Sequence, residues 1–339
     1  MQKQIGNGAP GRVLVTAKSV AQSPKAIALM REAGHEVIVQ NTPAPIDQAW
    51  LVEQVRDIDA LVFAMEPMDA AVIGAANRLK LIARPGVGYD NVDLEAATRK
   101  GVIVSIAAGT NDQSVADFTF SLMLEAMRGV SRASTSVRAH GWERFTGTEA
   151  WRKKICVVGL GRIGRGVVKR ARGFDMEVLA VCPRLDLEFG REHGVRFCSL
   201  DDALAQADIV TLHLPLDHAT RHMINARTLA QMKRGAYLIN TSRGGLLDEE
   251  AVVQAIRSGH LAGVAVDVLQ QQGVGSPSCL IGVEGITVTP HMATFTHESI
   301  ERVAMSVAES VITALAGRMP RHVINPTAWD RSVLEESMP

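Results

Sequence analysis

Short apolar runs alternate with helical patterns of apolar residues along the first hundred positions of the chain. The runs predict strands at residues 13–16, 36–39, 60–63, 80–83 and 102–105. Helical patterns fill the intervals, at residues 24–33, 47–57, 70–76 and 94–100. Alternation of this kind predicts a parallel sheet with helices on both faces.

The pattern changes near residue 112, where apolar residues begin to recur at helical spacing. Breakers are few, Gly129 being one, so we expect a single long helix over residues 112–139. A second alternating unit begins near Trp151, with strands expected at residues 155–158, 177–181, 209–212, 237–240, 263–266 and 287–288. These are close to the six strands of a doubly wound dinucleotide-binding fold. A last helix over residues 297–316 is expected to pack back on the first domain.

A glycine motif lies between the first strand and the first helix of this second unit. It reads Gly159-Leu160-Gly161-Arg162-Ile163-Gly164. The first glycine permits a tight turn, the second lets the backbone approach a pyrophosphate, and the third lets helix and strand pack closely. Such a motif alone is often only a tight turn. Its strand–helix–strand context here favours dinucleotide binding, with the phosphates at the helix N-terminus.

About 150 residues precede the motif, so another unit comes first. The fold class is therefore expected to be α/β with two doubly wound domains. We expect a flavodoxin-like substrate domain (residues 1–108 plus 292–339) and a Rossmann NAD(P)-binding domain (residues 109–291). The chain would cross between them near residues 108–111 and 290–294, and the interdomain cleft would be a usual place for a substrate.

Composition narrows the functional classes. The chain has 339 residues, 47% hydrophobic and 21% charged, with a formal net charge of +0. It has no basic block, so we expect neither a nucleic-acid nor a membrane partner. No apolar run approaches the roughly 18 residues of a membrane span, and residues 1–11 are polar without a signal-peptide core. The four cysteines are widely spaced, which favours reduced thiols in a cytoplasm, and no metal-ligand spacing appears.

Further segments match one family. They read Gly-Val-Gly-Tyr-Asp-Asn-Val-Asp at residues 86–93, Asn-Thr-Ser-Arg-Gly-Gly-Leu-Leu-Asp-Glu at 240–249 and Thr-Pro-His at 289–291. With His-Leu-Pro at 213–215 and the glycine motif, they resemble the D-isomer-specific 2-hydroxyacid dehydrogenases over roughly residues 12–325. Segments 93–101 and 141–144 are similar to the phosphoglycerate dehydrogenase branch. The resemblance implies hydride transfer between a D-2-hydroxy acid and its 2-oxo acid.

The resemblance assigns roles to four residues. Arg243 would hold the substrate carboxylate and polarise its carbonyl, as a guanidinium fork can. His291 would be the general acid and base, for which an imidazole has a suitable pKa. The N–H groups of Val87 and Gly88 would bind the substrate carboxylate. The alternatives are a surface arginine, a hinge histidine and a plain turn.

The resemblance also implies a set of cofactor-binding residues. They are Gly159, Gly161, Arg162, Ile163, Gly164, Cys182, Arg184, His213, Pro215, Thr220, Thr241, Ser242 and Asp267. Asp267 is expected near the nicotinamide carboxamide, with a structural cap as its alternative role.

The chain departs from the family where a glutamate usually pairs with the histidine. That position, 29 residues after Arg243, is Gln272, and a slip of one or two residues still gives glutamine. Three hypotheses remain: a working neutral His–Gln pair, a reaction without proton transfer as in formate dehydrogenases, or lost catalysis with dinucleotide binding kept. The last would make the chain a dinucleotide-sensing binding protein.

A second departure concerns the cofactor. NAD enzymes usually have an acid at the end of the second strand to bind the ribose 2′-hydroxyl, and Cys182 stands there instead. Arg184 could pair with a 2′-phosphate, which favours NADP over NAD. Asp186 opposes this, because it could serve a ribose or neutralise Arg184.

The substrate segment departs as well. Phosphoglycerate dehydrogenases often carry an arginine where this chain has Ala64, and Glu66 beside it would repel a phosphate. We also expect no appended regulatory domain after residue 339. We therefore expect a small acid such as glyoxylate or hydroxypyruvate. Family members are commonly homodimers, and residues 112–139 with the Trp142 segment would suit the interface.

Overall fold

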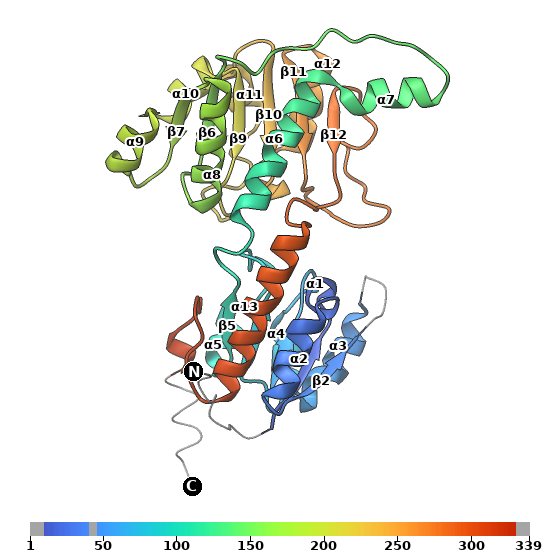
Figure 1. The fold of residues 1–339 in the computed structure, drawn as a ribbon, viewed down its shortest axis with the longest axis vertical. Coiled ribbons are helices and arrows are strands. Elements are labelled where there is room, and N and C mark those ends of the chain that lie inside the picture. Colours follow the sequence, from blue (N-terminus) through green and yellow to red (C-terminus); the bar gives the residue numbers. More distant parts are fainter. Residues whose placement is uncertain (1–9, 41–45, 330–339) are drawn as a thin grey trace. The chain divides into compact units, whose positions relative to one another are not determined.

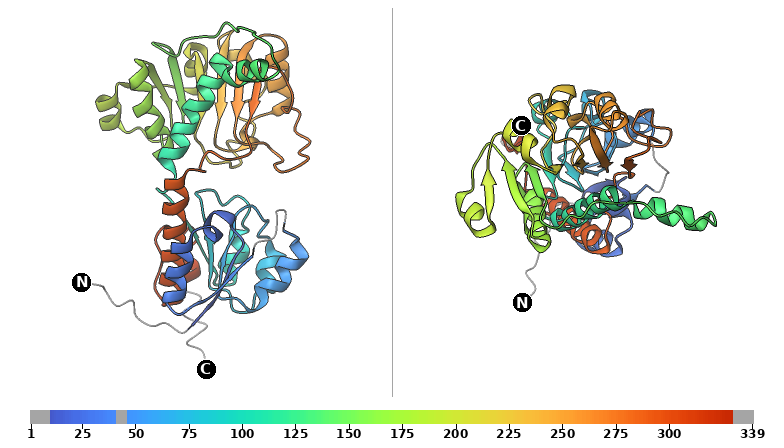
Figure 2. Two further views of the ribbon diagram at one scale, coloured as in Figure 1. Left: turned by 45° about the vertical axis from the view of Figure 1, so that its right-hand side comes forward. Right: turned by 90° about the horizontal axis from the view of Figure 1, so that it is seen from above.

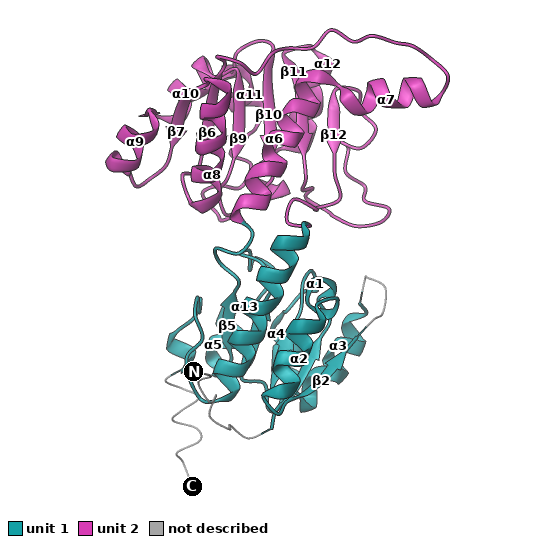
Figure 3. Cartoon of the chain, in the orientation of Figure 1, with its two compact units in different colours: residues 1–111, 296–339 teal, residues 112–295 magenta. Residues whose placement is uncertain are grey.

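The computed structural model describes residues 10–40 and 46–329, so the predicted polar N-terminal segment lies almost wholly outside the described residues. The chain forms two compact units (Figure 3), residues 1–111 with 296–339 (unit 1) and residues 112–295 (unit 2). The changes of unit predicted from sequence were at residues 108/109 and 291/292. In the structure they lie at 111/112 and 295/296. At the second, the Thr296 side chain accepts a hydrogen bond from Ser299 N and caps the last helix.

Unit 1 is built on a five-stranded parallel sheet in the order β2-β1-β3-β4-β5. Its strands are β1 (Arg12–Val15), β2 (Glu36–Val39), β3 (Ala60–Val62), β4 (Leu81–Arg84) and β5 (Ile103–Ile106). Each lies within a residue or two of its predicted position. This strand order is that of flavodoxin-like folds, which confirms the predicted fold class for this unit.

Helices cover both faces of this sheet, as Figures 1 and 2 show. One face carries α1 (Lys18–Ala21), α2 (Pro24–Glu32) and α13 (His297–Leu315), and the other carries α3 (Gln48–Gln54), η1 (Val55–Asp57), α4 (Ala70–Ala75) and α5 (Leu94–Arg99). Strand side chains alternate between the two cores: Val13 and Val15 face α13, while Leu14 joins the opposite core. The predicted return of the last helix to the first domain is confirmed, because α13 packs on α2 and β4.

Unit 2 contains a seven-stranded parallel sheet in the order β12-β11-β10-β9-β6-β7-β8. Its strands are β6 (Lys154–Val158), β7 (Glu177–Val181), β8 (Val195–Phe197), β9 (Ile209–Leu212), β10 (Ala236–Asn240), β11 (Leu261–Val266) and β12 (Ile286–Val288). If β6 is numbered as the first strand of this unit and the sheet is read from β8, the order is 3-2-1-4-5-6, and β12 follows as one more strand at the edge. This is the doubly wound Rossmann arrangement. The sequence missed β8, a three-residue strand in which no side chain is fully buried.

Two layers of helices enclose this second sheet (Figure 1). One layer contains α6 (Asp112–Arg128), α8 (Arg162–Ala171) and η2 (Arg172–Phe174), and the other contains α10 (Leu200–Gln206), α11 (Ala226–Gln231) and α12 (Glu249–Arg257). Helix α9 (Leu187–His193) precedes β8, and η3 (Gly244–Leu246) follows β10. Ile155 and Val157 face α6 and α8, whereas Cys156 and Val158 face the other layer.

The predicted single helix over residues 112–139 is wrong. The structure has two helices, α6 and α7 (Val130–Arg138), because Gly129 adopts a left-handed conformation with φ +59°. Its N–H closes the last turn of α6 on Glu125 O at 2.7 Å. No residue of α7 is buried in the described part of the chain.

Across the described residues, none of the helices combines the length and the apolar character needed to cross a bilayer.

Candidate active site

The predicted site residues of unit 2 follow the carboxyl ends of its strands. The glycine motif follows β6, Cys182 follows β7, His213 follows β9, and Arg243 comes three residues after β10. The strand order changes direction between β6 and β9, which are hydrogen-bonded neighbours. Ligands of open parallel sheets bind at such a switch point, outside the strand ends.

The three motif glycines have different surroundings. A Cβ on Gly159, whose φ is +99°, would lie 2.4 Å from His213 O, and one on Gly164 would lie 2.1 Å from Gly159 O. Real Cβ atoms do not approach that closely, so these two positions require glycine for the turn and for helix–strand packing. A Cβ on Gly161 would meet no atom within 4 Å. Gly161 therefore borders open space, where an approaching ligand would contact bare backbone.

The N-terminus of α8 faces that open space without a capping side chain. Gly161 is its N-cap residue and supplies no side-chain hydrogen bond, and Arg162 is exposed at the first helical position, followed by half-buried Ile163. Unsatisfied N–H groups and the helix dipole make such an end favourable for phosphate.

His213 stays uncharged over the physiological range. Burial lowers its pKa to about 3, and its Nε2 lies 2.9 Å from Thr211 Oγ1. Its buried Nδ1 has no hydrogen-bond partner among the described residues. The adjoining turn is closed by Thr220, whose hydroxyl donates to Pro215 O at 2.9 Å. The His213 side chain, which follows β9 beside the glycine motif, therefore adds no charge there.

The segment after β7 carries one arginine, Arg184, and one carboxylate, Asp186, which is paired with an arginine of α8. Asp186 binds Arg165 Nη2 at 2.7 Å and also accepts a hydrogen bond from Phe189 N at the start of α9. These backbone and side-chain hydrogen bonds lower the pKa of Asp186. Cys182 donates its thiol to Arg184 O at 3.1 Å, and burial raises the pKa of this thiol. Arg184 is exposed, and no ion pair to it occurs within the described residues.

The backbone around Arg243 is held by its neighbours. Asn240, fully buried at the end of β10, donates from Nδ2 to Arg243 O at 2.8 Å and accepts from Ser242 N at 3.0 Å. Ser242 donates its hydroxyl to Leu212 O at 2.7 Å, and Thr241 Oγ1 lies 3.0 Å from a hydroxyl of α6. The hydroxyls predicted to bind a cofactor therefore also fix this loop to β9 and α6. The Arg243 side chain donates to Ser242 O at 2.7 Å.

Asp267 holds the segment that carries the predicted catalytic histidine. It is 1% exposed, and its carboxylate accepts hydrogen bonds from Thr289 Oγ1 (2.7 Å), Met292 N (2.9 Å) and Ala293 N (2.8 Å). This is the structural cap that the sequence left as an alternative. The expected contact with a carboxamide stays a prediction.

His291 and Gln272 lie together. His291 Nδ1 is 2.7 Å from Gln272 Oε1, across a gap of 19 residues in sequence. Because an amide oxygen only accepts, this contact places a proton on Nδ1. His291 is held at φ +52°, in the left-handed region that few non-glycine residues occupy. The structure thus brings together the two residues that the family resemblance paired.

The glycine loop of unit 1 is tied to the loop after β3. Arg84 donates to Gly88 O at 2.9 Å and to Ala64 O, and Asn91 donates to Glu66 O at 2.8 Å. The carboxylate of Glu66 folds back and accepts from Ala64 N at 3.0 Å.

Two backbone N–H groups of the glycine loop are not used in hydrogen bonds within the described residues of the protein. In the described part of unit 1, the N–H groups of Val87 and Gly88 donate to no protein acceptor. They are therefore available to an anion.

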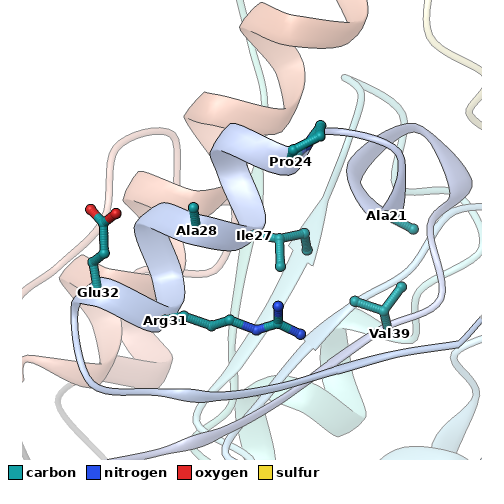
Figure 4. Close-up of a pocket in the computed structure, with 7 residues that line it drawn as sticks. All are labelled: Ala21, Pro24, Ile27, Ala28, Arg31, Glu32 and Val39. Carbon is teal, nitrogen blue, oxygen red and sulfur yellow. The ribbon is translucent and has the colours of Figure 1, made fainter.

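One cavity of unit 1 lies away from these loops. It measures about 450 Å³ and opens between α2 and β2, beside Ile27 and Val39 (Figure 4). Its one guanidinium, from Arg31, donates to Val37 O at 3.3 Å. The cavity holds none of the predicted site residues.

Comparison with known proteins identifies the family. Residues 120–293 match the family model described as "D-isomer specific 2-hydroxyacid dehydrogenase, NAD binding domain". A glyoxylate reductase of Korarchaeum cryptofilum is 36% identical over 301 residues, which cover 87% of this chain and 91% of that protein. The chain belongs to the D-isomer specific 2-hydroxyacid dehydrogenase family.

Other relatives agree with this placement. A D-3-phosphoglycerate dehydrogenase of Mycobacterium leprae is 39% identical over 92% of this chain, but the chain spans only 58% of that protein. The TT0316 protein of Thermus thermophilus superposes with a TM-score of 0.84, at 34% identity over 92% of this chain and 99% of that one. A glyoxylate reductase of Paecilomyes thermophila gives a TM-score of 0.82, at 28% identity over 93% and 98%.

As a member of this family, the chain is an oxidoreductase with a nicotinamide dinucleotide-binding domain. The residues present fit such a cofactor: the open backbone at Gly161 and the uncapped N-terminus of α8 would hold its pyrophosphate. The described residues contain no cluster of His, Cys, Asp and Glu side chains suited to a metal ion.

The supporting residues were missed by sequence reasoning. Asn240 lies inside a matched motif but has no chemistry of its own to mark it. Arg84 and Asn91 gave no signal, because their role depends on which two loops meet. A sequence motif can mark a segment that contains supporting residues, but it does not show which residue of the segment supports which loop.

Proposed function

We propose that the chain reduces a small 2-oxo acid, of the glyoxylate or hydroxypyruvate type, to the D-2-hydroxy acid, and catalyses the reverse reaction. The observation that carries this proposal is the 2.7 Å contact between His291 Nδ1 and Gln272 Oε1, on the strand-end side of a Rossmann sheet. This contact supports the proposal, because it joins the residue that would be the acid/base group to the residue that replaces the family's glutamate.

Arg243 binds the substrate carboxylate and polarises the carbonyl oxygen through its guanidinium fork. A reduced nicotinamide, when bound, supplies the hydride to the carbonyl carbon. His291 gives a proton to the oxygen as negative charge develops there, and takes it back in the oxidation direction. Gln272 keeps a proton on Nδ1, so Nε2 is the nitrogen that exchanges the catalytic proton.

A glutamine partner changes the energetics of this step. A carboxylate would favour the imidazolium, whereas the neutral amide orients the ring without that stabilisation. We therefore expect proton transfer to be less favourable at high pH than with a glutamate. The rival interpretations are a reaction without proton transfer, which would use the same glutamine, and a sensor that only binds the dinucleotide. Turnover of an oxo acid with a pH-dependent rate would exclude both.

The substrate proposal rests on Glu66. Its carboxylate lies against Ala64 N, in the loop tied by Arg84 to the glycine loop. A substrate phosphate near this carboxylate would be repelled, and no arginine takes the position of Ala64. The glyoxylate reductase of Korarchaeum cryptofilum, 91% of which is covered by its alignment with this chain, also supports a small acid as the substrate.

For the cofactor, we favour NADP. Cys182 brings no charge to the ribose position, and Asp186 is already bound to Arg165 and to α9. Asp186 is therefore occupied and does not neutralise Arg184, which leaves the Arg184 guanidinium for a 2′-phosphate.

We further expect a homodimer in the cytoplasm. Helix α7 has no buried residue, and Val130, Val137 and Trp142 are 62%, 51% and 78% exposed, which supports an interface there. All four cysteines are unpaired, as suits a reducing compartment. Trp142→Asp should raise the fraction of monomer in sedimentation, and an unchanged distribution would exclude this surface.

Arg243→Ala and Arg243→Lys test the catalytic role. Both should lose roughly a thousandfold or more in kcat/KM for the oxo acid, because lysine keeps the charge but not the fork. Cofactor affinity, measured by fluorescence titration, should stay within about threefold. Arg227→Ala, which removes an exposed guanidinium of the same unit, is the matched control. Loss of cofactor binding together with turnover would remove Arg243 from the proposed role.

A further inference from the structure

Glu249 is a buried acid whose carboxylate binds a neighbouring loop and not its own helix. It is the first residue of α12 and is 8% exposed. The N-cap of α12 is Asp248, which accepts from Ala251 N at 3.1 Å, so capping does not require Glu249. Its carboxylate contacts the loop of residues 270–278 instead.

The two oxygens of Glu249 bind the two ends of that loop. Oε1 accepts from Gln270 N at 2.8 Å, and Oε2 accepts from Ser278 Oγ at 2.7 Å. A buried carboxylate is costly unless it is hydrogen-bonded, and here both oxygens are bonded and lie at a helix N-terminus. One side chain thus closes a loop in which Gln272 is the third residue.

The same loop is also packed on the segment that carries Arg243. A Cβ on Gly244 would lie 2.0 Å from the carbonyl carbon of Leu269, so the two backbones touch. Gln270 donates from Nε2 to Leu247 O at 2.8 Å. The loop with Gln272 is therefore fixed to the residues between Arg243 and Glu249.

We infer that Glu249 is a positioning residue, which holds the 270–278 loop so that Gln272 Oε1 stays on His291 Nδ1. This inference deepens the proposed function and rests on it for its catalytic meaning. Asp267 performs the matching task on the other side, because it binds Thr289, Met292 and Ala293 around the histidine. Two buried carboxylates thus place the two members of the pair.

The test measures the titration of His291 by NMR on the full chain with labelled histidine, with His291→Asn to assign its signal. Gln272→Glu puts a carboxylate beside the imidazole of His291 and should raise the titration midpoint by about one pH unit. Glu249→Ala should abolish at least half of that rise, because the loop no longer holds residue 272 against the ring. Glu249→Gln should keep most of it, since an amide can accept from Gln270 N and donate to Ser278 Oγ.

A double-mutant cycle separates positioning from the loss of a charge. The midpoint change caused by Glu249→Ala is compared in the wild-type and Gln272→Glu backgrounds, so that the direct effect of the removed charge cancels. Glu250→Gln removes an exposed acid one residue away and should leave the rise intact. A full rise in the Glu249→Ala background, or an equal loss with Glu250→Gln, would overturn the inference.

Ser278→Ala covers the case in which Glu249→Ala does not fold. It removes one of the two contacts and keeps the carboxylate. The rise in the titration midpoint of His291 caused by Gln272→Glu should then be smaller. An unchanged rise would count against the inference that Glu249 holds the loop. Because the readout does not require turnover, a chain without reductase activity would refute the proposed function while leaving this test decisive.

Discussion

Replacing Gln272 by glutamate tests the neutral pair directly. In the structure the amide oxygen already lies 2.7 Å from His291 Nδ1, so a carboxylate of the same length reaches the ring without a change of backbone. The negative charge favours the imidazolium, and the pKa of the histidine should rise relative to the wild-type protein.

The magnitude follows from distance and exposure. Two unit charges about 4 Å apart attract by about 1 kcal/mol in water and by about 4 kcal/mol at an effective dielectric constant near 20. Gln272 is exposed and His291 is half-buried, so the value should fall near the lower limit. One pKa unit corresponds to about 1.4 kcal/mol, so we expect a rise of about one unit.

The assay is the pH dependence of kcat/KM for reduction of the oxo acid. Reduction needs the protonated imidazole, so the fall in rate at high pH should move upward by about one pH unit in Gln272→Glu. Gln271→Glu, which adds the same charge one residue away, is the control and should move the profile less. A profile that does not move in Gln272→Glu would show that Gln272 does not touch His291 in solution, and our reasoning about the pair would be refuted.

Other predictions follow from the cofactor side of the site. Gly161→Ala should fold normally but lose roughly tenfold or more in NADPH affinity. Gly164→Ala, whose Cβ would lie 2.1 Å from a backbone oxygen, should instead lower the unfolding temperature. Equal effects of the two variants on cofactor affinity and on unfolding temperature would contradict the roles assigned to the two glycines. Arg184→Ala should lower kcat/KM with NADPH about tenfold and leave that with NADH unchanged, and a parallel loss with both cofactors would exclude a 2′-phosphate contact. His213 has a folded pKa of about 3 against an ordinary 6.5, so the unfolded chain binds the extra proton between these values and stability should fall as the pH drops through that window, by about 1.4 kcal/mol per pH unit. Urea unfolding at pH 7 and pH 4.5, compared with His213→Asn, measures this, and a variant equally acid-sensitive would contradict it.

Sequence periodicity predicted most of the fold because the buried strands alternate side chains between two cores. Short apolar runs predicted the sheet of each unit, and the glycine motif indicated where the second sheet begins. The errors have local causes. Strand β8 has three residues without a fully buried side chain, and α6 ends where Gly129 takes a left-handed conformation that a helical pattern does not reveal.

For the candidate site, the sequence supplied the side chains that we propose to react, but not the residues that support them. The family resemblance paired Gln272 with His291, and the structure confirms that the two side chains are in contact. The contacts of Glu249 with the loop and of Asp267 with the histidine segment span 21 to 29 residues of sequence. Which loops meet depends on the packing of whole strands and helices, so no local pattern could show that these acids face inward.

Hydride transfer to a small 2-oxo acid is the reaction that we claim for this chain. The most direct test is the initial rate of reduced-cofactor loss, with NADPH and NADH in parallel, over a panel that includes glyoxylate, hydroxypyruvate, pyruvate and branched 2-oxo acids. We predict turnover of at least one of these acids, and a higher rate with NADPH. Tight binding of either cofactor without turnover of any acid on the panel would contradict the claim.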